Sequence, residues 1–274
     1  MSKYTYNKNY FEVINTKEKA YILGFLYADG CILDQRKSKI LEITLSKNDK
    51  NHLQKFLDDL ESDVPIKTKK VKLGNKEYEA CRIFICSTYL CDCLIELGCA
   101  PRKSLTLEFP KNKVPDNLIN YFILGYFDGD GCFSPREDTN TASLSFVGTY
   151  DFLIGILNVF KDKGLVNKYT KIYKKGNAYH FFLYNKANIK RILFYLYGNK
   201  EIYLERKYVK IKEFYKNHKT HQRGVYFDKR LKKWIACITI NKKRNIIGKF
   251  EDEESAIQAR IEKEIELFKN AEIK

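Results

Sequence analysis

The sequence predicts an α+β fold made of two copies of one αββαββα unit, followed by a small three-stranded sheet with one helix. Three observations support this prediction. An apolar run ending in Asp-Gly occurs twice, the same order of helix and strand patterns follows each run, and the composition changes after about residue 217. A duplication of this kind also predicts a pseudo-two-fold axis between the copies. We place the first repeat at residues 1–104, the second at 105–215 and the C-terminal unit at 216–274.

The two apolar runs are expected to be short helices. They read ILGFLYADG from Ile22 and ILGYFDGDG from Ile123, and helix-start signals precede them, Asn15 or Thr16 in one case and Pro115-Asp116 in the other. Each helix then carries one carboxylate at its C-terminal end, Asp29 or Asp130, and these residues are 101 positions apart.

Small residues recur four positions apart on one face of each predicted helix. These are Gly24 with Ala28, and Gly125 with Gly129. A glycine inside a helix costs about 1 kcal/mol relative to alanine, so its repetition at matching positions needs a reason. Two ridges of small residues would let the helix backbones approach closely, and we therefore expect Gly24 and Gly125 to be helix-packing residues.

The two aspartates occupy an unfavourable place, the negative end of a helix dipole. If the helices pair, Asp29 and Asp130 lie near each other, and one would protonate unless a cation sits between them. The sequence therefore predicts a divalent metal site with oxygen ligands. The alternative is a pair of buried core helices, each stopped by a glycine. That alternative explains the apolar runs but not the repeated aspartate.

The two runs resemble the paired motifs of LAGLIDADG homing endonucleases in their single-chain form. The family's catalytic acid is the eighth motif position, which falls on Asp29 and Asp130. The sixth position is Tyr27 in the first copy and Asp128 in the second; it is not a metal ligand in the family, so the departure leaves the catalytic pair intact. The resemblance covers about residues 15–215, including the segments GCAPRKS before residue 105 and LYGNKEIYLERKY from Leu196.

This resemblance implies a site-specific double-strand DNA endonuclease that hydrolyses phosphodiesters with Mg²⁺, for which Mn²⁺ or Ca²⁺ substitutes in binding. It implies that the backbone carbonyls of Ala28 and Gly129 join the two aspartates as metal ligands. Each half would cut one strand across the minor groove and leave staggered ends. A lysine that the family places at the start of the last helix of a repeat matches Lys186, whose alternative role is an ordinary surface lysine. The first half has Ser87-Thr88 there, so we expect the half-sites to differ in rate.

The remaining elements follow the same order in both halves. In the first we expect strands at 31–33 and 39–45, a helix at 48–60, strands at 65–73 and 78–86, a helix at 88–97 and an extended linker at 100–110. In the second we expect strands at 132–134 and 142–147, a helix at 150–163, strands at 168–174 and 178–184, and a helix at 186–197.

Composition points to a polyanionic partner. The net charge is +16 and the pI is near 9.3, and no apolar run approaches the length of a membrane span. The eight cysteines contain no C-x-x-C pair, which favours reduced thiols over a zinc finger. We expect a monomeric cytoplasmic protein, encoded by a bacterial, phage or organellar genome, that acts on double-stranded DNA with a long asymmetric target and does not bind membranes.

Recognition is expected from the sheet faces, where arginine and lysine read guanine edges or bind phosphate. The alternating residues proposed for DNA binding are Lys39, Thr44, Lys67, Lys69 and Arg82 in the first half, and Ser143, Ser145, Lys171, Lys174 and His180 in the second. Individually, each is more often a solvated side chain than a base contact.

The C-terminal unit is strongly basic, with ten Lys or Arg and one acidic residue between Lys219 and Phe250. Three short strands and an amphipathic helix are expected. Its segments RGV, KWIA and IGKF resemble the Apetala-type DNA-binding domains of plant ethylene-response factors. The resemblance implies DNA contacts from Arg223, Arg230, Lys233, Trp234, Lys242 and Arg244. The alternative is a small solvated basic domain with Trp234 in its core.

A second function is compatible with the same fold, namely a non-catalytic nucleic-acid binder such as a transcriptional regulator or an RNA-splicing maturase. Loss of either motif aspartate would favour that function, and both are present. The sequence therefore favours the endonuclease.

Overall fold

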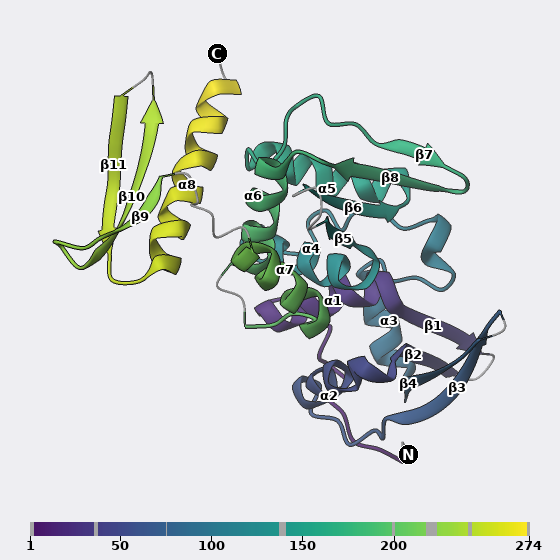
Figure 1. The fold of residues 1–274 in the computed structure, drawn as a ribbon. Coiled ribbons are helices and arrows are strands. Elements are labelled where there is room, and N and C mark those ends of the chain that lie inside the picture. Colours follow the sequence, from purple (N-terminus) through teal and green to yellow (C-terminus); the bar gives the residue numbers. More distant parts are fainter. Residues whose placement is uncertain are drawn as a thin grey trace.

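Two consecutive units with the same element order make up most of the chain, and a smaller unit follows them (Figure 1). The computed structural model describes residues 3–35, 38–74, 76–136, 141–198, 201–217, 224–240 and 243–272. Every strand pairing in the described sheets is antiparallel. The predicted α+β fold with two αββαββα repeats is confirmed.

The first unit forms a sheet of strand order β1-β2-β4-β3. Its elements are α1 (Lys17–Asp29), β1 (Gly30–Gln35), β2 (Ser38–Ser46), η1 (Lys47–Asp49), α2 (Lys50–Asp59), β3 (Lys67–Leu73), β4 (Lys76–Cys86), α3 (Thr88–Glu96) and η2 (Lys103–Leu105). Thr16 caps α1 by accepting a hydrogen bond from the Lys19 backbone N–H, as one of the sequence signals predicts.

The second unit repeats this topology in a sheet of order β5-β6-β8-β7. Its elements are α4 (Ile119–Asp130), β5 (Cys132–Arg136), β6 (Thr141–Gly148), α5 (Tyr150–Asp162), β7 (Tyr173–Lys175), β8 (Ala178–Leu183), α6 (Lys186–Tyr197) and α7 (Glu205–Asn217). Pro115-Asp116 does not cap α4. That helix begins after Leu118, which makes no side-chain cap bond.

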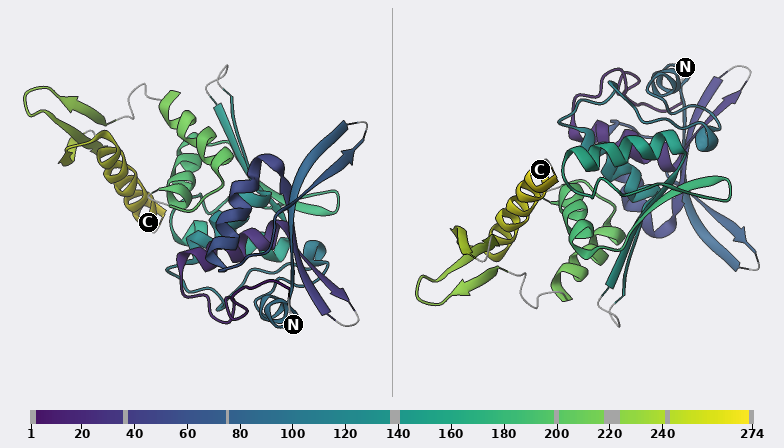
Figure 2. Two further views of the ribbon diagram at one scale, coloured as in Figure 1. Left: turned by 90° about the horizontal axis from the view of Figure 1, so that it is seen from below. Right: turned by 90° about the horizontal axis from the view of Figure 1, so that it is seen from above.

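Each four-stranded sheet has one face covered by helices and one open face. In β2, Leu41 and Ile43 are buried, whereas Glu42 and Thr44, which alternate with them, are partly exposed. In the second sheet the buried rings of Phe146 and Phe181 stack at 4.9 Å. The period-2 alternation therefore sets which side chains remain available to a partner. Figure 2 shows the hairpins β3–β4 and β7–β8 projecting away from the C-terminal unit.

Two expectations for connecting segments are wrong, and one helix was missed. The strand expected at 168–174 is reduced to Tyr173–Lys175, because Asn167 accepts bonds from the backbone N–H groups of Tyr169 and Thr170 and forms a local turn instead. The linker expected to be extended contains η2. Helix α7 was not expected at all.

The C-terminal unit is a sheet of order β11-β10-β9 covered by one helix. Its elements are β9 (Val225–Asp228), β10 (Lys233–Ile240), β11 (Lys243–Phe250) and α8 (Glu253–Glu272). Val225, Ala236 and Ala256 form its buried centre. Figure 1 shows α8 between this sheet and α6. Within the described ranges, no helix is long and apolar enough to span a bilayer.

Candidate active site

Helices α1 and α4 cross with their backbones in contact. A β-carbon added to Gly24 would overlap the carbonyl oxygen of Phe122, and one added to Gly125 would overlap the carbonyl oxygen of Tyr21. Both obstacles are backbone atoms and cannot rotate away. Only glycine therefore permits this crossing at the two positions.

The crossing brings the two helix ends together. α1 ends at Asp29 and α4 at Asp130. A β-carbon added to Gly129 would overlap the side chain of Ala28 and lie 3.0 Å from Oδ2 of Asp29. The small residues near the helix ends thus set the separation of the two chain segments that carry the carboxylates.

The two carboxylates have raised pKa values. Burial and, to a smaller extent, the charge of Asp130 raise the pKa of Asp29 to about 6, against the opposing charges of Lys207, Lys103 and Arg206. Burial also raises the pKa of Asp130, against the charges of Lys103 and Lys207. A divalent cation would relieve this desolvation and repulsion.

The donor set fits a hard cation with few protein ligands. The described part of the chain contains no cluster of three or more His, Cys, Asp or Glu side chains able to share a metal. A pair of carboxylates supplemented by backbone carbonyls, water and substrate oxygens is the kind of shell that Mg²⁺ prefers. Asp29 and Asp130, with the carbonyls of Ala28 and Gly129 beside them, offer such a set.

Two buried lysines occupy equivalent places next to the carboxylates. Lys103 donates a hydrogen bond to the carbonyl of Gly30, the residue after Asp29. Lys207 donates to the carbonyl of Gly131, the residue after Asp130, at 2.5 Å. It also donates at 2.5 Å to the carbonyl of Phe127. Burial lowers the pKa of Lys207 to about 8.

The lysine expected at the site from the sequence is a different residue, Lys186, and no local pattern indicated Lys103 or Lys207 as site residues. The structure places Lys186 at the first position of α6, with Nζ 5.9 Å from the ring centroid of Phe214. Lys103 and Lys207, not Lys186, are the lysines whose charges lower the pKa values of both motif aspartates. In the sequence the two lysines share only the dipeptide context Arg-Lys, at 102–103 and 206–207.

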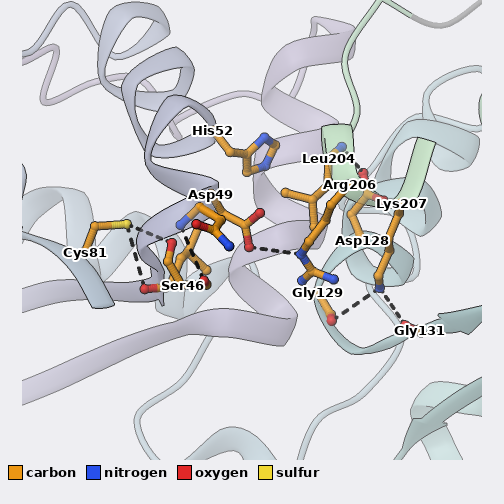
Figure 3. A network of polar contacts seen from close by, with 12 residues as sticks. Ser46, Asp49, His52, Cys81, Asp128, Gly129, Gly131, Leu204, Arg206 and Lys207 are labelled. Carbon is orange, nitrogen blue, oxygen red and sulfur yellow. Dashed lines mark hydrogen bonds and ion pairs between the residues drawn. The ribbon is translucent and has the colours of Figure 1, made fainter. Parts of the chain in front are cut away.

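The sixth motif position of the second copy is a buried polar centre. Asp128 is fully buried and accepts hydrogen bonds from the hydroxyls of Tyr21 and Tyr197 and, at 2.7 Å, from the backbone N–H of Leu204. Figure 3 shows Asp128 beside Leu204 and Lys207. The bond to Leu204 anchors the chain just before Lys207. Asp128 thereby links α1, α6 and the segment that supplies Lys207.

Arg206 joins the second repeat to the first. Its Nε lies 3.0 Å from Oδ2 of Asp49, which is itself buried (Figure 3).

A cavity of about 160 Å³ opens beside Asp130 and is lined in part by Lys103, Ser104 and Tyr126. This cavity gives solvent access to the carboxylate from the side of Lys103.

The residues expected on the sheet faces divide into two groups. On the open faces lie Thr44, Lys67, Lys69 and Arg82 of the first sheet and Ser143, Ser145 and His180 of the second.

Three expected contacts lie elsewhere. Lys39 shares the helix-covered face with Leu41 and pairs with Asp92 of α3, because strand alternation does not reveal which face is open. Lys174 lies opposite Tyr179, on the face away from His180. Lys171 precedes β7 because the expected strand is shorter.

In the C-terminal unit, Arg230 is exposed in the turn after β9. Nζ of Lys233 lies 2.8 Å from Glu251. The guanidinium of Arg244 lies 4.8 Å from the ring centroid of Tyr226. Trp234 is half-buried against the small core. Arg223 and Lys242 lie outside the described residues.

Comparison with known proteins identifies solved structures with a similar fold. No protein-family model matches the sequence, and no curated protein does. The solved structure of the homing endonuclease I-WcaI bound to its DNA recognition sequence is similar with 16% identity, 73% of this chain and 90% of that one covered, and a TM-score of 0.53. The LAGLIDADG homing endonuclease I-GzeII in complex with its DNA target gives 16% identity, coverages of 72% and 88%, and a TM-score of 0.48. This chain therefore shares the fold of the homing endonuclease I-WcaI.

Proposed function

We propose that this protein is a site-specific double-strand DNA endonuclease that hydrolyses phosphodiesters with divalent metal. The observation that carries the proposal is the pair of carboxylates, Asp29 and Asp130, at adjoining ends of two helices whose glycines force a backbone crossing. A structural protein gains nothing from two neighbouring carboxylates that repel each other, whereas a metal-dependent nuclease requires them.

Asp29 and Asp130, with the carbonyl oxygens of Ala28 and Gly129, are the ligands we assign to Mg²⁺; Mn²⁺ or Ca²⁺ replaces it for binding. When bound, the cation polarises the scissile phosphoryl group and lowers the pKa of an attacking water. The raised pKa of Asp29 supports this assignment, because bound cation would return it to its ionised form.

Lys103 and Lys207 take the role that the sequence assigned to Lys186. They hold the carbonyls of Gly30 and Gly131 and so fix the turn that follows each aspartate. Their charges favour the ionised carboxylates and would also attract a phosphate group. Because the first repeat has Lys103 and the second has Lys207, each half-site carries one such lysine.

DNA is the partner we assign to the open sheet faces, with one monomer spanning a long asymmetric target. The charge of +16 supports a polyanion, and I-WcaI, which shares the fold, is bound to its DNA recognition sequence. The C-terminal sheet adds a second DNA-binding surface of the Apetala type. Its exposed cations among the described residues are Lys229, Arg230, Lys232, Arg244 and Lys249.

Selection of cleaved sites from a randomised duplex library in Mg²⁺ tests the proposal. We expect a defined target cut on both strands, and Asp29→Asn or Asp130→Asn to abolish cleavage of at least one strand while binding is retained. Asp162→Asn is the matched control, because Asp162 is an exposed carboxylate at the end of helix α5. Cleavage that survives the double substitution would overturn the site. Specific binding in Mg²⁺ without any nicking would favour the non-catalytic binder.

A further inference from the structure

The open faces of the two sheets are equivalent by duplication but differ in chemistry. Strand register defines the equivalence. Each sheet has a cross-strand row that starts at the cysteine two residues after the motif aspartate. In the first sheet this row is Cys31, Glu42 and Phe84. In the second it is Cys132, Ser145 and Phe182. The neighbouring rows are Thr44, Arg82 and Lys67 in the first sheet, and Val147, His180 and Tyr173 in the second.

The first sheet presents charge at these positions. Arg82 lies 3.8 Å from Glu42, and its guanidinium covers the ring of Phe84 at 4.4 Å from the centroid. Lys67 pairs with Arg82 across the strands. The phenylalanine of this sheet is therefore covered by a cation, and hydrogen-bond donors dominate the face.

The second sheet replaces that charged group with uncharged residues. Glu42, Arg82 and Lys67 correspond to Ser145, His180 and Tyr173. Burial and the charge of Lys175 lower the pKa of His180, which disfavours the charged form of its ring. At these three positions the second sheet thus carries uncharged, mainly aromatic side chains where the first sheet carries charges.

The aromatic rings of this surface form a line along β8 and the residue that follows it. His180 and Phe182 are parallel within 6° at 5.4 Å, and Phe182 and Tyr184 are parallel within 8° at 6.4 Å. Tyr184 is 71% exposed. His180, Phe182 and Tyr184 therefore present a continuous line of aromatic side chains on the open face. The proposed function supplies duplex DNA as the partner of this face, and its major groove admits a two-stranded β-ribbon.

An apolar side chain such as phenylalanine suits one feature of the major groove, the methyl group of thymine. The centroids of neighbouring rings are separated by about two base-pair steps, since successive base pairs are about 3.4 Å apart along the DNA axis. We propose that Phe182, with His180 and Tyr184 stacked on it, reads thymine methyl groups, so that the second repeat binds a thymine-rich half-site while Arg82 and Lys67 of the first repeat read guanine. This inference rests on the proposed function.

The test uses the duplex target selected by cleavage, bound in Ca²⁺. All thymines of one half-site at a time are replaced by deoxyuridine, which lacks only the methyl group. We expect one half-site to lose affinity by about fourfold for each contacted methyl group, and the other to change little. This arm of the experiment uses the unaltered protein, so it does not depend on whether a variant folds.

Phe182→Ala should then bind thymine and deoxyuridine targets equally. The equivalent substitution Phe84→Ala is the matched control and should preserve the discrimination, because Arg82 covers that ring. Any one of three results would overturn the inference. Deoxyuridine has no effect on affinity in either half-site, Phe182→Ala still discriminates thymine from deoxyuridine targets, or the protein binds single strands more tightly than the duplex. If the protein still cleaves its target when one of these results is found, the proposed function stands and only the inference fails. Failure to cleave or bind any duplex refutes the proposed function, and the inference with it.

Discussion

Asp29→Asn should stabilise the metal-free protein, and the gain should depend on pH. The carboxyl group of Asp29 is largely buried, and its pKa is raised from the ordinary value of 3.8 to about 6. Folding therefore costs free energy whenever this group is ionised. Asparagine carries no charge and avoids that cost.

The magnitude follows from the shift in pKa. A group with a raised pKa binds protons more tightly in the native state, so native stability falls as pH rises from about 4 to 6 and stays at the lower level above. A shift of about two units corresponds to about 3 kcal/mol. The stability gained by Asp29→Asn should therefore be about 3 kcal/mol at pH 8 and about half of that at pH 5.

Urea denaturation in EDTA at pH 5 and pH 8 measures this difference, with Asp162→Asn as the control for an exposed helix-end carboxylate. The comparison between the two pH values removes any constant effect of the asparagine amide. Added Mg²⁺ should stabilise the unaltered protein and have less effect on Asp29→Asn. A stability difference that is the same at both pH values would refute the reasoning, because Asp29 would then have an ordinary pKa.

Two further predictions concern the surroundings of the site. Lys207→Met removes a charge that lowers the pKa of Asp29, so the pH of half-maximal cleavage should move upward; a profile that stays in place would contradict this coupling. Gly24→Ala should lower the free energy of unfolding by more than about 3 kcal/mol, because the new methyl group meets the Phe122 backbone. Gly176→Ala, at φ +61° with open space around it, should cost only about 1 kcal/mol in the same thermal or urea unfolding experiment. Equal losses from the two substitutions would argue against a close helix crossing.

Local patterns were sufficient for the repeated architecture. Alternation of apolar residues identified the paired strands, and the period of 3.6 identified helices such as α6, whose expected bounds Lys186 and Tyr197 match the structure. Segments with weak patterns were misjudged. Asn167 makes a turn where a strand was expected, since its side chain competes with the sheet for the backbone N–H groups.

The open face of each sheet could not be inferred from alternation alone. The two-residue period of a strand shows that neighbouring residues lie on opposite faces. It does not show which face the helices cover. Lys39 was expected on the open face and instead pairs with Asp92 of α3. The contrast between Arg82 and His180 likewise became visible only through strand register, which places them at equivalent points of the two sheets.

The sequence by itself determined the duplicated fold and put one aspartate at the end of each motif helix, because helix ends and strand periods depend on neighbouring residues. Tertiary structure decided which charges act on those aspartates. Lys207 is 76 residues from Gly131, and Lys103 is 73 residues from Gly30, and no local pattern connects them. Only folding brings each lysine to its carbonyl, and Asp128 helps to hold one of them through its bond to Leu204.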